Sequence, residues 1–210
     1  MAPVVVGIVD YGLGNRRSVE KAVERVGAGA VLSADHDVLR EADGLILPGV
    51  GAFPAGMELL RGAGLDELLH ERAAAGVPIL GCCLGMQLLF DASTEHGGAT
   101  GLGLIAGDVR ALEAPGLKLP HIGWSEVTWQ AGSPLLDGLP DPSVFYHVHS
   151  YVPHPADPAT VLGVSTYGAP FASVVASGNV CGAQFHPEKS SVHGLRMLAN
   201  FAATCARTPA

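Results

Sequence analysis

The chain has 210 residues, of which 48% are hydrophobic and 15% charged, and its formal net charge is −8 at pH 7. This length and composition predict one domain with a sizeable core and exclude a disordered chain. The balance of 12 basic against 20 acidic residues argues against a nucleic-acid binder, which needs a basic face.

The start of the chain and its cysteines bear on where the protein works. Met1–Pro3 leads into the apolar run Val4–Val9, which is too short for a secretory signal and has no basic start. No apolar run reaches the length of about 20 residues that spans a bilayer. The cysteines show neither metal nor disulfide spacing; they are Cys82, Cys83, Cys181 and Cys205. We therefore expect a cytoplasmic protein.

The first half of the chain alternates short apolar runs with helical patterns. The predicted elements are a strand at Val4–Val9, a loop at Asp10–Asn15, a helix at Ser18–Val26, a strand at Gly44–Leu47, a helix at Leu59–Ala75, a strand at Val77–Leu80 and a helix at Met86–Ala92. This alternation predicts an α/β fold with a mostly parallel central sheet flanked by helices. The strand runs are continuously apolar, as in sheets buried on both faces.

The second half has a different pattern. Between Gly101 and Gly182, short β-like pieces are separated by Gly and Pro, which predicts antiparallel strands added to the parallel sheet. These pieces are Trp124–Trp129, Val144–Val148 and Phe171–Ala176. A helix at Gly194–Ala206 is expected to close a single domain over residues 1–206, and residues 207–210 are expected to fray.

Two adjacent cysteines lie between the strand at Val77–Leu80 and the helix that follows. In a nucleophile elbow, the residues two positions before and after the nucleophile must be small. Gly81 and Gly85 flank Cys83 in this way, whereas two leucines flank Cys82. The geometry therefore selects Cys83. At a helix N-terminus its sulfur is stabilised as a thiolate, and the N–H of Leu84 is placed to bind an oxyanion.

A cysteine nucleophile needs a base and a group that orients the base. The segment "GAQFHPEKS" provides His186 and Glu188 after a strand-like run at Val180–Phe185. Pro187 between them favours an extended path, so the two side chains can project the same way. We expect Glu188 to hold the imidazole of His186.

The segment "LPGVGAF", Leu47–Phe53, follows a predicted strand. Its glycines allow the backbone to approach a bound carbonyl closely or to flip a peptide. Gly49 and Val50 are therefore candidates for a second oxyanion donor.

Two other motifs carry weaker signals. His147 and His149 have the spacing of metal ligands along a strand, but no third ligand is near in sequence, so we expect no metal site. Asp10–Asn15, "DYGLGN", is glycine-rich before a helix, as in a phosphate-binding loop, but lacks the P-loop lysine. A plain turn or a contact surface is the favoured interpretation.

With Cys83, His186 and Glu188 in place, the sequence resembles the class I, or triad, glutamine amidotransferases over nearly its whole length. The family's marks are the elbow Gly81–Gln87 and the segment Phe185–Glu188. Further segments are similar to the branch that supplies the glutaminase subunit of imidazole glycerol phosphate synthase; they are "DYGLGNRRSV", "LPGVGAF", "LPHIGWSEV" and "FYHVHSY".

The resemblance implies that Cys83 attacks the side-chain amide of glutamine, that His186 moves the proton and that Glu188 orients His186. It implies neither a cofactor nor a metal. The positions that match the family's other sites are Gln87, Glu95, Tyr146 and Ser150 for glutamine, Gly49, Val50 and Leu84 for the oxyanion, and Asn15, Trp124 and Lys189 for the face toward a HisF-type (β/α)8-barrel cyclase. That partner would use the ammonia to make imidazole glycerol phosphate and aminoimidazole carboxamide ribotide in histidine biosynthesis.

Three positions depart from the family's usual pattern. Cys82 stands where Ile or Val is commoner, Ser125 where Asn follows Gly-Trp, and His147 where an apolar or aromatic residue is usual. Alternative interpretations are a glutaminase serving another synthase, such as anthranilate or GMP synthase, a cysteine peptidase or stress-type α/β protein, and an inactive binding partner. The segments around Asn15 and Trp124 disfavour the first, the pair of His186 and Glu188 disfavours the stress-type protein, and the intact triad disfavours the last.

Overall fold

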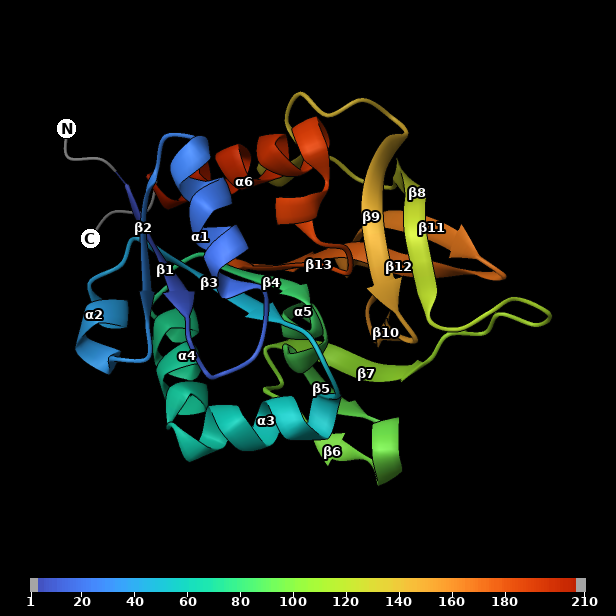
Figure 1. Ribbon diagram of the computed structural model, residues 1–210, viewed down its shortest axis with the longest axis horizontal. Coiled ribbons are helices and arrows are strands. Elements are labelled where there is room, and N and C mark those ends of the chain that lie inside the picture. The colour runs from blue at the N-terminus through green and yellow to red at the C-terminus, as the bar shows by residue number, and fades with distance from the viewer. Residues whose placement is uncertain (1–3, 207–210) are drawn as a thin grey trace.

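A computed structural model describes residues 4–206 of the chain (Figure 1). The strands are β1 (Val5–Val9), β2 (Gly29–Ser33), β3 (Gly44–Gly49), β4 (Ile79–Cys83), β5 (Phe90–Ser93), β6 (Ala99–Thr100), β7 (Ile105–Ala111), β8 (His121–Trp129), β9 (Ser143–His149), β10 (Tyr151–Pro155), β11 (Val161–Tyr167), β12 (Ala169–Ser177) and β13 (Val180–Ala183). The α-helices are α1 (Arg16–Arg25), α2 (His36–Arg40), α3 (Phe53–Gly62), α4 (Leu65–Ala74), α5 (Leu84–Leu88) and α6 (Ser191–Cys205). Short 3-10 turns are η1 (Glu95–Gly97), η2 (Pro134–Leu136), η3 (Pro158–Thr160) and η4 (Pro187–Lys189).

A nine-stranded sheet, in the order β2-β1-β3-β4-β13-β12-β11-β8-β9, forms the centre of the fold. The strands from β2 to β13 pair in parallel, and those from β13 to β9 pair antiparallel. The predicted α/β fold with an added antiparallel portion is therefore confirmed. A smaller sheet, β10-β7-β5-β6, was not predicted.

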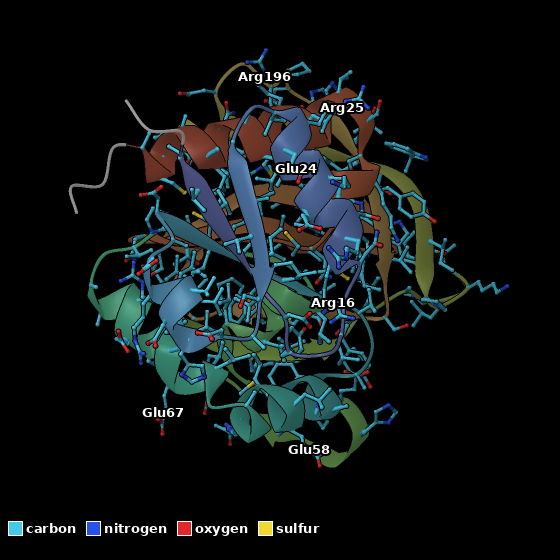
Figure 2. All side chains as sticks on the ribbon, turned by 60° about the vertical axis from the view of Figure 1, so that its left-hand side comes forward. Arg16, Glu24, Arg25, Glu58, Glu67 and Arg196 are labelled. Atoms are coloured by element: carbon cyan, nitrogen blue, oxygen red, sulfur yellow. The ribbon has the colours of Figure 1, made fainter. Side chains whose placement is uncertain are left out.

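Helices cover both faces of the parallel strands. In Figure 1, α1 and α6 lie above the sheet, and α3, α4 and α5 lie below it. Side chains of β4 alternate between the two sides: Ile79 packs with the helices below, and Leu80 packs with α1 and α6. Charged side chains of the lower helices, such as Glu58 and Glu67, point outward (Figure 2). Among the helices of residues 4–206, none is both long enough and apolar enough to cross a membrane.

The single helix predicted at Leu59–Ala75 is wrong, because the structure divides this stretch into α3 and α4. Gly64 lies between them with φ 66°, a left-handed conformation that glycine adopts at little cost and that ends a helix. The α3 helix also begins earlier than expected, at Phe53, whose N–H donates to Glu95 Oε2 at 2.7 Å. This capping carboxylate is 42 positions away in the chain and so leaves no local signal.

The helix predicted at Met86–Ala92 is also too long. The α5 helix ends at Leu88, and Phe90 starts β5, which pairs with Ile105 of β7. The N–H groups of Leu102 and Leu104 donate to the carbonyls of Leu88 and Leu89 at 2.9 and 2.8 Å. These distant donors compete with a further helical turn.

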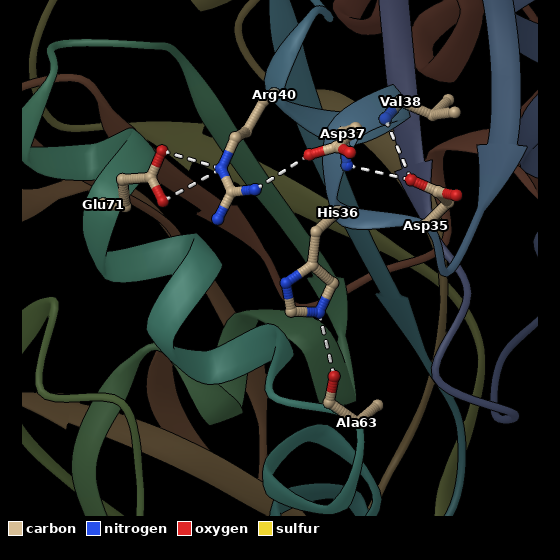
Figure 3. Close-up of polar contacts among 7 residues, drawn as sticks. All are labelled: Asp35, His36, Asp37, Val38, Arg40, Ala63 and Glu71. Carbon is tan, nitrogen blue, oxygen red and sulfur yellow. Dashed lines mark hydrogen bonds and ion pairs between the residues drawn. The ribbon is translucent and has the colours of Figure 1, made fainter.

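The predicted helix at Ser18–Val26 is confirmed as α1, which begins at Arg16, and the closing helix as α6. The strand β2 and the helix α2 were missed. The α2 helix has only five residues and depends on side chains: Asp35 Oδ1 caps it by accepting from Asp37 N at 2.9 Å, and Arg40 Nε donates to Glu71 of α4 at 3.0 Å (Figure 3). The predicted tail at residues 207–210 lies outside the described residues.

Candidate active site

The β4–α5 junction forms a sharp turn at Cys83. Cys83 has φ 54° and ψ −114°, a conformation that costs a non-glycine residue of order 1–3 kcal/mol and is typical of functional sites. A Cβ at Gly81 would lie 2.6 Å from the carbonyl oxygen of Gly85, and a Cβ at Gly85 would lie 1.8 Å from that of Leu47. Both flanking positions therefore require glycine, as the elbow interpretation expects.

Cys83 is buried, with 6% of the residue exposed. Cys83 Sγ lies 3.6 Å from Val148 O and 4.0 Å from Gln184 Nε2. Cys82, by contrast, is buried with Leu80 on the side of the sheet covered by α1 and α6. The two adjacent sulfurs therefore have different surroundings, and Cys83 faces the cavity described below.

His186 and Glu188 lie after β13, the strand next to β4. His186 Nδ1 is 3.0 Å from Glu188 Oε1, and both side chains are almost fully buried. Burial lowers the pKa of His186, but hydrogen bonds with Cys83 and Glu188 outweigh it and raise that pKa to about 9. His186 is therefore held as an imidazolium at neutral pH, which stabilises negative charge on the adjacent sulfur.

A cavity of about 260 Å³ opens above these residues. It is lined by Val50, Gly51, Cys83, Leu84, Gln87, Glu95, Pro120, Val148, His149, Ser150, Tyr151, His186 and Lys189. The cavity therefore brings together the elbow, the predicted oxyanion segment and residues that lie far apart in the chain, from Glu95 to Lys189.

Three of the four predicted glutamine-binding residues, Gln87, Glu95 and Ser150, line this cavity. Gln87 Nε2 is already engaged with Tyr151 O at 3.0 Å, so its Oε1 is the atom left to meet a ligand. The fourth, Tyr146, is not a lining residue; its ring packs against Trp124 with 5.8 Å between ring centroids.

The predicted oxyanion residues surround the elbow. Leu84 and Val50 line the cavity, and a Cβ at Gly49 would lie 2.8 Å from Gly85 N. Gly49 is thus pressed against the start of α5 by a contact that excludes any larger residue.

The three residues predicted on the partner face lie in different places. Trp124 is 54% exposed on β8, and Lys189 is exposed at the cavity. Asn15 is half-buried, and its Nδ2 donates to Glu188 Oε1 at 3.3 Å. Asn15 therefore contacts the carboxylate of Glu188, a predicted catalytic residue.

Sequence reasoning missed several residues around the site. Val148, His149 and Tyr151 line the cavity, but the predicted strand at Val144–Val148 contains only the first of them and does not mark any as a site residue. Gln184 lies within the predicted strand-like run at Val180–Phe185 and contacts the sulfur of Cys83. Their alternation along strands was the available signal, but it does not reveal which side of the sheet faces the elbow.

His121, His147 and His149 gather on β8 and β9. His121 Nδ1 is 3.2 Å from His149 Nε2, and the rings of His121 and His147 stack at 5.3 Å. Within residues 4–206, no group of three His, Cys, Asp or Glu side chains is arranged to hold a metal ion. The cluster is instead a packed set of hydrogen-bonded imidazoles.

Comparisons with known proteins show the family of the chain. The family model described as Glutamine amidotransferase class-I matches residues 7–205. The chain is 51% identical over 201 residues to imidazole glycerol phosphate synthase subunit HisH from Symbiobacterium thermophilum, covering 96% of this chain and 93% of that protein. It is 48% identical over 197 residues to the HisH subunit from Bacillus cereus (strain G9842), covering 94% and 93%.

Solved structures also share the fold. PurLQS from Thermotoga maritima superposes with a TM-score of 0.75 at 19% identity, over 99% of this chain and 100% of that one. The chain belongs to the class I glutamine amidotransferases and, within them, to the HisH family of imidazole glycerol phosphate synthase subunits.

Proposed function

We propose that the chain hydrolyses glutamine to glutamate and ammonia through Cys83, His186 and Glu188. It then passes the ammonia to a HisF-type (β/α)8-barrel cyclase subunit in a heterodimer. The observation that carries this proposal is that the strained elbow cysteine and His186, which Glu188 contacts at 3.0 Å, line one cavity. The similarity to HisH subunits supports the choice of partner.

The reaction follows from this geometry. The Cys83 sulfur attacks the amide carbon of the glutamine side chain, and the carbonyl oxygen becomes an oxyanion that Leu84 N–H and the Gly49–Val50 segment stabilise. The His186 imidazolium gives its proton to the leaving nitrogen, so ammonia departs and a glutamyl thioester remains. His186, now neutral, takes a proton from water, whose oxygen attacks the thioester and releases glutamate.

Glu188 orients the imidazole and favours its charged form through the 3.0 Å contact with Nδ1. For substrate binding, the cavity lining supports Gln87, Glu95 and Ser150 as glutamine contacts. Tyr146 has less support, because its ring contacts Trp124 instead.

The ammonia must leave on the side where the partner sits. We place the partner over the exposed Ile122 and Trp124 of β8, because Pro120 on the same chain segment lines the cavity and Lys189 stands exposed beside it. There the cyclase would use the ammonia to form imidazole glycerol phosphate and aminoimidazole carboxamide ribotide in histidine biosynthesis.

We further propose that residues 1–206 act as one glutamine amidotransferase domain, which the family match over residues 7–205 supports. All four cysteines of the chain are free thiols. A catalytic thiolate works best in a reducing compartment, so we assign the reaction to the cytoplasm.

The test is glutamate release by the chain alone, with a HisF-type subunit, and with that subunit plus its ribonucleotide ligand. We expect low turnover in the first two samples and a large increase in the third, because a flip of the Gly49–Val50 peptide would complete the oxyanion site only when both substrates are bound. Ammonium salt should support synthesis by the complex without glutamine. Absence of glutamate release in all three samples contradicts the proposal. Equal release in all three contradicts the gating alone.

A further inference from the structure

The loop Asp10–Asn15 between β1 and α1 touches both halves of the catalytic site. At one end, the Tyr11 hydroxyl donates to Pro48 O at 2.8 Å, and at the other, Asn15 contacts Glu188. In the middle, a Cβ at Gly14 would lie 3.2 Å from Gly49 N and 3.3 Å from the Pro48 carbonyl carbon. The glycine-rich motif is therefore packed onto the start of the oxyanion segment.

Tyr11 is a buried side chain with one polar atom. Tyr11 is 4% exposed and belongs to the core on the α3–α5 side of the sheet. Burial raises the pKa of its phenol, the nearby Cys83 sulfur raises it further, and Arg16 opposes both. The hydroxyl therefore stays protonated and acts as a hydrogen-bond donor.

The acceptor of that hydrogen bond, Pro48 O, belongs to the peptide between Pro48 and Gly49, at the start of the predicted oxyanion segment. In a trans peptide the C=O and N–H point in opposite directions, so a bond that holds Pro48 O also fixes where Gly49 N–H points. A Cβ at Gly49 would lie 2.5 Å from the Tyr11 hydroxyl oxygen, so this oxygen fills the space of the side chain that Gly49 lacks. The Pro48–Gly49 peptide would then stay in place while the next peptide, Gly49–Val50, flips.

We propose that Tyr11 is a positioning residue of the glutaminase reaction: its hydroxyl fixes the Pro48–Gly49 peptide so that the Gly49–Val50 segment presents an N–H to the oxyanion. This inference rests on the proposed glutaminase function. Because the proposed role of Tyr11 concerns the oxyanion, loss of its hydroxyl should destabilise the transition state and the tetrahedral adduct more than bound glutamine.

The test is Tyr11→Phe in the complex with the partner and its ligand, since this change removes the hydroxyl and keeps the buried ring. Loss of one oxyanion donor costs about a hundredfold or more in rate, and a misplaced donor should cost less. We expect kcat for glutamate release to fall about tenfold with KM within about twofold of the parent value.

A second readout separates positioning from general damage to the fold. Glutamate γ-semialdehyde forms a thiohemiacetal, in which the cysteine sulfur bonds to the aldehyde carbon and the aldehyde oxygen takes the oxyanion position. Tyr11→Phe should weaken inhibition by this aldehyde about as much as it lowers kcat. Glutamine binding to Cys83→Ala should be the same with and without Tyr11→Phe.

Tyr167→Phe is the matched control, because the Tyr167 hydroxyl also donates to a backbone carbonyl, Lys118 O, at 2.8 Å but outside the cavity. This control should leave both readouts unchanged. The inference is overturned if Tyr11→Phe keeps the parent's kcat and its sensitivity to the aldehyde. It is also overturned if Tyr11→Phe weakens glutamine binding to Cys83→Ala as much as it lowers kcat. Failure of the proposed function is a different result: glutamate release that persists in Cys83→Ala.

Discussion

Asn15 Nδ2 donates to Glu188 Oε1 at 3.3 Å, although the two residues are 173 positions apart in the chain. The same oxygen is 3.0 Å from His186 Nδ1, and the other oxygen, Oε2, is buried without a hydrogen-bond partner among residues 4–206. The orientation of the Glu188 carboxylate therefore depends on two contacts, one of which comes from the loop before α1.

Asn15→Ala should lower kcat for glutamine hydrolysis by roughly tenfold, since a hydrogen bond to a charged group contributes about 1.5–3 kcal/mol. The assay uses saturating partner, because Asn15 is also expected near the partner face. Ser18→Ala is the control: Ser18 Oγ donates to Asn15 Oδ1 at 2.8 Å, so its loss leaves the bond to Glu188 in place. An unchanged kcat in Asn15→Ala would show that His186 alone orients Glu188.

Glu188→Gln should shift the pH dependence of the reaction. The pKa of His186 is raised to about 9, above its unfolded value, so the imidazolium persists through neutral pH and is lost as the pH rises through about 9. Activity that needs this acid should decline over the same range. The uncharged side chain introduced by Glu188→Gln removes one of the causes of the raised His186 pKa. The alkaline limb of the kcat profile should therefore move to lower pH. An unmoved alkaline limb would contradict the role of Glu188.

The sequence predicted the parts of the fold whose signals are local. Continuous apolar runs identified β1, β3 and β4, and the glycines around Cys83 identified the elbow. The break at Gly64 and the end of α5 at Leu88 were missed, because the first requires a left-handed glycine and the second depends on donors near residue 102.

The candidate site shows the same division. The elbow needs residues without a Cβ two positions on either side of the nucleophile, and Gly81 and Gly85 meet this need within a short segment. Cys83 could therefore be selected from sequence. Tyr11 could not, because its partner Pro48 is 37 positions away and nothing local indicates which residue its hydroxyl meets. Tyr146 and His149 lie on one strand, and only the packed sheet shows which of them reaches the cavity.

His147→Phe should make stability less sensitive to acid. Burial, then the neighbouring His121, lowers the pKa of His147 to about 3, whereas an unfolded histidine binds its proton near pH 6.5. The unfolding free energy should therefore fall as the pH drops from about 6.5 toward 3, by up to about 1.4 kcal/mol per pH unit for this residue. Urea unfolding at about pH 8 and about pH 5 should show a smaller decrease in the variant.

At about pH 8 the unfolding free energy of His147→Phe should be about 1–3 kcal/mol lower than that of the parent. The reason is that Ser173 Oγ loses its hydrogen-bond partner, His147 Nε2, which lies 2.9 Å away. His147→Phe combined with Ser173→Ala removes both polar groups and should recover much of that loss. Identical acid sensitivity in the parent and His147→Phe would mean that His121 and His149 account for the effect without His147.

A glutamine analogue with an electrophilic side chain should label Cys83 among the four cysteines. Burial raises the pKa of Cys181 to about 11 and, with Asp43, that of Cys205 to about 12, so both remain thiols at neutral pH. Burial also raises the pKa of Cys82. Peptide mapping after labelling should place the adduct in the segment with Cys83. An adduct chiefly on Cys181, which is partly exposed, would contradict the assignment.

The most direct measurement compares Cys83→Ala with Cys82→Ala in the complete complex, by glutamate release and by synthesis driven with either glutamine or ammonium salt. The account predicts that Cys83→Ala abolishes glutamate release and glutamine-dependent synthesis. Cys82→Ala should retain most of both, because Cys82 lies in the core below α1 and α6. Both variants should support ammonium-driven synthesis. Glutamate release that persists in Cys83→Ala would contradict the account.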